Sequence, residues 1–283
     1  MAEQDPVFYL APASDLASQI INHDRNCSYK VPFQGQFVLR AGMERSSKKP
    51  GCLLTFGRDE GQGDIYLPTR SWSKLHCYFF LNPLTLRLIL RDVSTTRDTH
   101  VSHWKKTPKD SKKYQLQGTP KQRVLLPEHD DIVIDIGKAR FSLIWPVPKT
   151  LEGQRASENA KIVFAQKVMP AVLDWTDLDD RVLPKKAYET RSEHTPSLAS
   201  QNKKHPKITH EQSRPLGKGS FGSVYETVDL YNGDVMAVKT VTHPPGNNNV
   251  KYAWKQEVET LSALVHVSLN SCRMSASVNI YIA

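Results

Sequence analysis

Three glycines and a downstream lysine have a spacing that suits binding to nucleotide phosphates. The pattern G-x-G-x-x-G-x-V occurs once, in Leu216-Gly217-Lys218-Gly219-Ser220-Phe221-Gly222-Ser223-Val224. Glycines let a backbone approach phosphate oxygens without side-chain clashes, and Lys239 follows in Ala237-Val238-Lys239. Because similar glycines also open a helix in dinucleotide-binding folds, the pattern has to be interpreted in its context.

The elements expected around these glycines are strands. Residues 223–229 and 234–241 have strand character and flank Asn232-Gly233, a pair that predicts a hairpin with a type I′ turn. Residues 250–265 follow with apolar side chains at spacings of three and four, which predicts a helix. A strand directly after the glycines argues against a dinucleotide-binding fold, in which a helix would follow.

Residues 216–266 resemble the N-terminal lobe of protein kinases, in which a Gly-rich loop, a hairpin and a lysine-bearing strand occur in this order. The resemblance implies that ATP binds here, with Lys239 on the phosphates. Glu257 is the implied ion-pair partner of that lysine, and Glu259 is the competing glutamate. The other implied nucleotide contacts are Leu216, Gly217, Lys218, Gly219, Ser220, Phe221, Gly222, Val224 and Ala237.

The sequence contains no H-R-D, D-F-G or A-P-E motif. These motifs supply the catalytic aspartate and the Mg²⁺ ligands of kinases, so the resemblance implies Mg²⁺ for complete family members and no metal site here. We therefore expect weak or absent ATP binding and no phosphoryl transfer by this chain, and leave its status as an enzyme open. The similarity ends abruptly at His266, which suggests a retained intron or a shifted reading frame; a spliced message continuing into H-R-D would show it.

Basic and hydroxyl-bearing residues gather at expected loops in the first half of the chain. Three short motifs occur in order: Gly57-Arg58, Ser73-Lys74-Leu75-His76 and Asp92-Val93-Ser94. An arginine beside a serine and a lysine can bind a phosphate through charge-assisted hydrogen bonds. An exposed surface arginine and an ordinary turn serine are the alternative interpretation.

This order of motifs resembles the FHA domain, a family that reads phosphorylated motifs with arginine. The resemblance implies that Arg58 and Ser73 contact the phosphate of a phosphothreonine and that Lys74 adds positive charge. In this family the histidine, here His76, braces the binding loops.

One loop departs from the family pattern. Where the family has Asn-Gly-Thr, this chain has Arg97-Asp98-Thr99. Thr96 and Arg97 complete the implied phosphopeptide contacts. We expect Asp98 to repel a phosphate placed near it, which would change affinity or residue preference.

Alternating hydrophobicity predicts many short strands over residues 31–145, and hence a β-sandwich. Two segments carry the pattern most clearly. The first is Leu84, Leu86, Leu88 and Leu90, separated by Thr85, Arg87, Ile89 and Arg91; the second is Ile132, Ile134 and Ile136 before a Gly137 turn, then Phe141, Leu143 and Trp145. The Lys-rich residues 103–123 predict a long exposed loop, with a nucleic-acid-binding patch as the alternative.

We predict a mainly β chain in five parts. These are an N-terminal extension (1–30), an FHA phosphopeptide-binding domain (31–147), a linker (148–213), a partial kinase N-lobe (214–266) and a tail (267–283). Within the linker, residues 162–173 are apolar enough to dock on a neighbouring element. Its basic pairs, Lys185-Lys186 and Lys203-Lys204, suit either nuclear import or a solvated linker.

Composition limits the expected partners, cysteine chemistry and cellular location. The formal net charge of +9 favours anionic partners. The four cysteines are far apart and form no C-x-x-C pair, which argues against zinc and disulfides. Neither a bilayer-spanning apolar run nor a signal segment occurs, so we expect a nuclear or cytoplasmic protein without a membrane partner.

An FHA module before a kinase domain resembles the FHA-containing checkpoint kinases, especially fungal ones. The resemblance implies a Ser/Thr kinase that docks on phosphothreonine-containing proteins and has an upstream damage-response kinase as a partner, with nucleic acid an unlikely partner. The alternative is a non-catalytic phosphothreonine-binding adaptor in DNA-damage or cell-cycle signalling.

Overall fold

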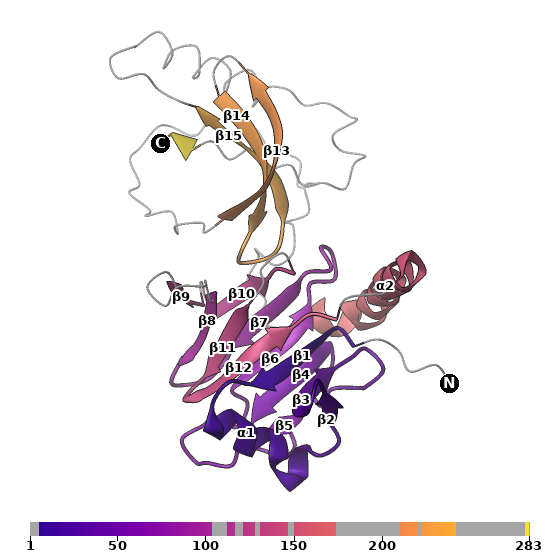
Figure 1. Cartoon of the computed structure of the whole chain (residues 1–283), viewed down its shortest axis with the longest axis vertical. Coiled ribbons are helices and arrows are strands. Elements are labelled where there is room, and N and C mark those ends of the chain that lie inside the picture. The colour runs from indigo at the N-terminus through magenta and orange to yellow at the C-terminus, as the bar shows by residue number, and fades with distance from the viewer. Residues whose placement is uncertain are drawn as a thin grey trace, which may run out of the picture. The chain divides into compact units, whose positions relative to one another are not determined.

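A computed structural model describes residues 6–103, 112–116, 121–127, 131–146, 150–173, 210–219, 222–241 and 281–282. The fold is mainly β, as the sequence predicts, and the chain divides into two compact units, Met1–Lys185 and Lys186–Ala283. Each unit contains its own sheets (Figure 1).

The first unit is a sandwich of two sheets. One sheet has the strand order β2 (Lys30–Phe33), β3 (Gln36–Ala41), β1 (Phe8–Pro12), β12 (Ala139–Ile144), β11 (Ile132–Ile136), β8 (Thr99–His103), β9 (Lys112–Gln115). The other has the order β10 (Lys121–Leu125), β7 (Leu88–Asp92), β6 (Cys77–Leu81), β4 (Cys52–Gly57), β5 (Ile65–Tyr66). Neighbouring strands are antiparallel except β4 and β5.

One buried cluster joins the two sheets. Phe8 of the first sheet lies 4.9 Å from Phe79 of the second, and Phe141 of the first lies 5.8 Å from Phe56 of the second, measured between ring centroids. All four side chains are fully buried. Aromatic pairs at such distances add stability to the apolar area that they bury. The predicted sandwich is therefore present, with its core between the sheets.

The first sheet begins earlier in the chain than the pattern of residues 31–145 indicates. Strand β1 lies between β3 and β12 and pairs with both. Helix α1 (Asp15–Asn22) follows, with the Ser14 side chain capping its first turn by accepting from the Ala17 N–H. A short 3₁₀ helix, η1 (Asp24–Asn26), comes next. Residues expected as an extension therefore complete the sheet.

The leucine-rich segment is a turn followed by a strand, not one long strand. Leu84 is half-exposed and Leu86 has a φ of 56°, so neither continues the alternation. The Asn82 side chain accepts from the backbone N–H groups of Leu84 and Thr85, which forms the turn. Strand β7 starts only at Leu88.

The expectation of one long loop over residues 103–123 is wrong in its described parts. Strand β9 pairs with β8 at one sheet edge, and β10 pairs with β7 at an edge of the other sheet. The β11–β12 hairpin, by contrast, matches its prediction, and Gly137 makes its turn with a φ of 56°.

Helix α2 (Leu151–Leu173) occupies part of the expected linker. Ala165 and Val168 are buried, and Phe164 packs against the core cluster of the sandwich. Val163 on the same helix is exposed. The apolar content of residues 162–173 is thus partly used for docking. No helix among the described residues has the length and hydropathy needed to cross a bilayer.

The second unit contains a four-stranded sheet of β13 (His210–Gly219), β14 (Gly222–Asp229), β15 (Val235–Val241) and β16 (Tyr281–Ile282). The first three strands are antiparallel neighbours, and β16 runs parallel to β15. Ser220, Phe221, Glu257 and Glu259 lie outside the described residues, as do the predicted helix at 250–265 and most of the tail.

The predicted hairpin between β14 and β15 is present, but its turn is longer than type I′. Only Gly233 has a positive φ, at 86°, whereas type I′ needs two such residues. The Gly233 N–H donates to the Asp229 carbonyl at 2.8 Å, and the Asp234 N–H donates to the Asn232 side chain at 2.9 Å. Side-chain hydrogen bonds therefore take the place of the second left-handed residue.

Candidate functional site

An open depression of ≈540 Å³ lies at one end of the sandwich and contains the residues predicted to bind phosphate. Arg58, Ser73 and Lys74 all contribute to it. Its lining consists of Arg58, Gln62, Arg70, Ser71, Trp72, Ser73, Lys74, Leu75, Val93 and Thr95. The sequence motifs thus brought three residues together correctly and missed others, chiefly Arg70 and Thr95.

Close backbone packing holds two sides of the depression together. Arg58 donates its N–H to the Ser73 carbonyl at 3.1 Å, and Asp59 donates to the Lys74 carbonyl at 3.2 Å. A Cβ atom at position 57 would lie 2.0 Å from the Lys74 carbonyl oxygen, so only glycine fits there. The glycine of the Gly57-Arg58 motif therefore sets the distance between the two loops.

A buried tryptophan fixes the loop that carries Ser73. Trp72 belongs to the core cluster and is 5% exposed, while its neighbours Ser71 and Ser73 reach the depression. A Cβ atom at Gly137 would lie 2.6 Å from the Trp72 indole nitrogen, so the indole packs closely on the β11–β12 turn. A loop anchored in the core loses little entropy when a ligand binds.

The Ser73 hydroxyl connects this loop to the one after β7. It accepts a hydrogen bond from the Thr95 N–H at 3.1 Å and lies 3.3 Å from the Thr95 hydroxyl. A hydroxyl that accepts one bond still has its own proton to donate. Ser73 can therefore hold the loop in place and donate to an anion at the same time.

The charges around the depression have one sign. Arg58, Arg70 and Lys74 are exposed, and their side chains form no ion pair with any described residue. The described lining contains neither Asp nor Glu. Unpaired cations around a hollow attract anions, and arginine is suited to phosphate because its planar fork can donate two parallel hydrogen bonds.

His76 lies beneath the depression and touches three segments. It is fully buried, donates its backbone N–H to Phe56 at 2.7 Å and accepts from the Val93 N–H at 3.0 Å. Its Nε2 lies 3.1 Å from Asp98 Oδ1, within ion-pair distance but without hydrogen-bond alignment, and its Nδ1 has no hydrogen-bond partner among the described residues. These contacts are those of a residue that braces loops.

Asp98 is occupied and does not line the depression. Besides His76, it faces the Thr96 hydroxyl, which donates to Asp98 Oδ1 at 2.8 Å. The expected repulsion between Asp98 and a phosphate stays a prediction. Sequence comparison alone could not place this carboxylate beside a buried imidazole.

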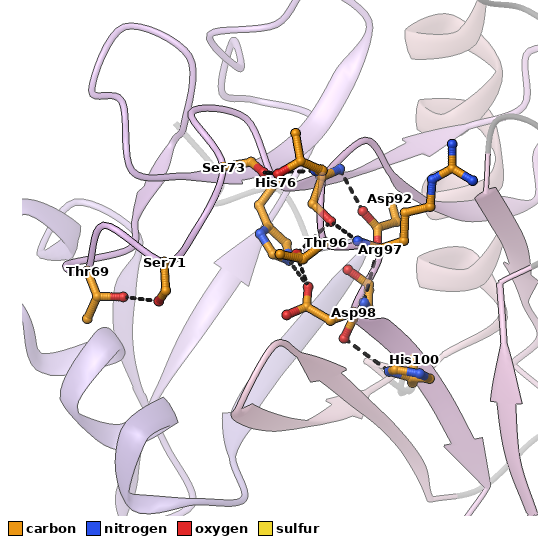
Figure 2. Close-up of polar contacts among 12 residues, drawn as sticks. Thr69, Ser71, Ser73, His76, Asp92, Thr96, Arg97, Asp98 and His100 are labelled. Atoms are coloured by element: carbon orange, nitrogen blue, oxygen red, sulfur yellow. Dashed lines mark hydrogen bonds and ion pairs between the residues drawn. The ribbon is translucent and has the colours of Figure 1, made fainter.

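The structure does not place Thr96 and Arg97 in the depression, although both were predicted to contact the peptide. Arg97 has a φ of 51°, its N–H donates to the Ser94 hydroxyl at 2.8 Å, and its guanidinium points away from His76 and Asp98 in Figure 2. Both residues are exposed at the rim of the site, where they can meet only a ligand that extends beyond the depression.

Acidification should weaken the fold through His76. Burial lowers the pKa of the His76 imidazole, and Asp92 and Asp98 oppose this only in part. The unfolded chain then binds a proton more readily than the fold does, so stability is complete above about pH 6.5 and falls as the pH drops towards the lower folded pKa. Urea unfolding between about pH 7.5 and 5.5 should show a slope of up to about 1.4 kcal/mol per pH unit. A His76→Gln protein with an equally steep slope would contradict this assignment.

Residues predicted to bind a nucleotide form a row across the second unit. Gly217 of β13 pairs with Val224 of β14, which pairs with Lys239 of β15. Ala237 lies two residues before Lys239, on the same face, and is exposed. A Cβ atom at Gly217 would meet nothing within 4 Å. Neither a positive φ nor a close neighbour in the described chain therefore explains this glycine.

Two large apolar side chains of the described sheet are exposed. Leu216 and Val235 are 50% and 41% exposed. Lys218 pairs with Ser223, and Gly219 pairs with Gly222, at the end of the β13–β14 hairpin. The described glycines of the predicted loop thus lie on the paired ends of β13 and β14, and Leu216 is the exposed apolar residue next to them.

No family model matches the chain. Serine/threonine-protein kinase atg1 of Botryotinia fuckeliana (strain B05.10) is 35% identical to it over 86 residues, or 29% of this chain and 9% of the relative. Serine/threonine-protein kinase ATG1 of Botryotinia fuckeliana gives the same values. The chain spans about 9% of the length of these curated relatives. It therefore contains a region similar to Ser/Thr protein kinases.

Proposed function

We propose that the first unit binds phosphothreonine-containing proteins in the depression formed by Arg58, Arg70, Ser73 and Lys74. The supporting observation is the convergence of three unpaired cations and a serine hydroxyl on one hollow whose described lining lacks acidic residues. A phosphothreonine carries close to two negative charges and three strong acceptor oxygens at neutral pH. Its charge and acceptors match the donors of this site.

The fold supports this function by holding the donors in place before a ligand arrives. Gly57 brings the loops together, Trp72 anchors one of them in the core, and His76 lies underneath. Because the site is preorganised, the binding energy of the phosphate is not used to order the loops. The resemblance to FHA domains agrees with this role, and we propose a docking module over residues 8–145, which includes strand β1.

A titration with matched peptides tests the proposal. Peptides carrying phosphothreonine should bind the protein, while the same peptides with threonine should bind at least about tenfold more weakly, because the charge-assisted hydrogen bonds are lost. Affinity should also fall with added salt. Equal affinity for both peptide forms across a degenerate library would refute phosphothreonine docking.

For the second unit we propose descent from a Ser/Thr protein kinase and a site for the phosphates and adenine of ATP. The partial similarity to kinases and the row of Gly217, Val224 and Lys239 support this. The open space over Gly217 and the exposed Ala237 fit a ligand that packs against backbone and small side chains. Lys239 would hold the phosphates, and bound ATP would supply a transferable phosphoryl group.

The residues that the structure describes do not form a site for Mg²⁺. Among the described residues no group of three or more His, Cys, Asp or Glu side chains could hold a metal ion, and the sequence lacks the metal-binding motifs of kinases. We therefore derive no phosphoryl-transfer step for this chain. A phosphothreonine-binding adaptor that acts with an upstream damage-response kinase, in the nucleus or cytoplasm, is the function that needs only the first unit.

The Gly217→Val substitution tests whether the glycine at this position is needed for nucleotide binding. Valine should leave thermal unfolding unchanged, since its Cβ has open space. It should weaken binding of a fluorescent ATP analogue at least about tenfold, because the branched side chain blocks the backbone from the phosphates. Equal affinity of both proteins, or no binding by either, would remove the nucleotide role from this chain.

A further inference from the structure

Thr95 is the only threonine that lines the depression within the described chain, and its side chain is exposed. Its hydroxyl oxygen lies 3.3 Å from the Ser73 hydroxyl oxygen, and its N–H donates to that same Ser73 oxygen. The side chain is therefore held beside one of the residues proposed to bind phosphate. A phosphate bonded to the Thr95 oxygen would therefore already lie at the depression.

We propose that Thr95 is a phosphorylation site whose phosphate occupies the depression of its own chain. A Ser/Thr protein kinase would transfer the γ-phosphoryl group of a nucleoside triphosphate to the Thr95 hydroxyl oxygen. The bond between that oxygen and phosphorus forms, the bond to the leaving diphosphate breaks, and the hydroxyl proton passes to the kinase base. The product places about two negative charges among Arg58, Arg70 and Lys74.

The charge of the surroundings favours this product. The lining includes three cations without ion-pair partners among the described residues and no acid, so the lining itself attracts an attached phosphate. Phosphorylation beside arginine residues creates charge-assisted hydrogen bonds that order a loop. The loop after β7 would then be tied to the loop after β4 by a phosphate as well as by Ser73.

The neighbouring Thr96 provides the contrast. Its hydroxyl donates to Asp98 Oδ1 at 2.8 Å, and Asp98 lies beside the buried His76. A phosphate on Thr96 would replace this donor with negative charge next to a carboxylate, which is unfavourable. Phosphorylation should therefore stabilise the protein at Thr95 and destabilise it at Thr96.

The consequence of the Thr95 modification is competition within one molecule. An attached group has an effective concentration in the millimolar range when its tether is short. A phosphopeptide in solution has to displace it, so phosphorylation of Thr95 would close the docking site. This consequence rests on the proposed phosphothreonine docking, whereas the occupation of the depression by the attached phosphate does not.

The test compares full-length proteins that carry phosphothreonine at position 95 or 96, introduced during synthesis. Phosphothreonine at 95 should raise the Tm by about 2–4 °C, and Arg58→Ala should abolish that gain. Phosphothreonine at 96 should lower the Tm. No gain at position 95, or a gain that persists in Arg58→Ala, would overturn the proposal.

A second measurement separates the modification from peptide docking. If the unmodified protein binds a phosphothreonine peptide, the protein phosphorylated at Thr95 should bind it at least about tenfold more weakly, and equal binding would overturn closure of the site. If the unmodified protein binds no such peptide, the docking proposal fails. The Arg58-dependent gain in Tm then tests by itself whether the Thr95 phosphate occupies the depression.

Discussion

Replacement of Arg58 by alanine should weaken binding of a phosphothreonine peptide by about 10- to 150-fold, since a hydrogen bond to a charged group contributes about 1.5–3 kcal/mol. Arg58 follows the last residue of β4, lines the depression and has no ion pair among the described residues. Its removal should therefore leave the fold intact and affect the ligand alone. Isothermal titration with one phosphopeptide measures the loss.

Two further variants determine what Arg58 contributes. Arg58→Lys keeps the charge but loses the planar fork, so it should recover only part of the affinity. Lys167→Ala removes one positive charge from an exposed position of helix α2, outside the lining, and controls for the net charge of the protein. If Arg58→Ala and Lys167→Ala weaken binding equally, the effect is a general one of charge, and Arg58 has no specific role.

The parts of the fold that the sequence predicted are those specified by neighbouring residues. The β11–β12 hairpin has alternating apolar residues on both sides of Gly137, and both strands pair with each other. Strand β1 was missed because its partners are distant: Leu10 pairs with Leu143 on one side and with Leu39 on the other. A short apolar run near a chain start does not reveal such partners.

The sequence pattern of the leucine-rich segment was misleading for two different reasons. Alternation continued by chance through a turn at Leu84, although Asn82-Pro83 is a typical turn signal. The alternation places Arg91 on the strand face opposite the leucines, yet its side chain is fully buried. Its guanidinium donates to Gln122 at 2.8 Å and to the Tyr78 hydroxyl at 3.2 Å. These acceptors lie on two other strands, and sequence periodicity does not identify them.

The candidate phosphate site also contains residues that the sequence predicted and residues that only the structure revealed. Arg58, Ser73 and Lys74 belong to motifs, and the structure brings them together. Arg70 and Thr95 join the same lining without a motif, because loop packing decides which neighbours of a motif face the hollow. Spacing in sequence therefore found the residues that belong to the three motifs, whereas the full set of charges required the loop geometry.

Gly57→Ala should have the largest effect on stability. The added Cβ would lie 2.0 Å from the Lys74 carbonyl oxygen and 3.2 Å from the Leu75 Cα, which are backbone atoms that cannot rotate away. Gly57 is also fixed from its other side, because its carbonyl accepts from the Leu67 N–H at 2.9 Å. Relief of the clash has to move the loop that carries Ser73 away from Arg58, so stability and phosphopeptide binding should fall together.

Overpacking of this kind costs about 3 kcal/mol, which corresponds to a fall in Tm of about 6–12 °C for a unit of this size. Gly61→Ala is the matched control, since its Cβ would meet only the Asp59 side-chain oxygen, at 3.1 Å. That variant should unfold and bind like the unmodified protein. A Gly57→Ala protein with unchanged Tm and unchanged phosphopeptide affinity would show that the two loops do not need this close approach, and would remove the physical basis for placing Arg58 and Ser73 in one site.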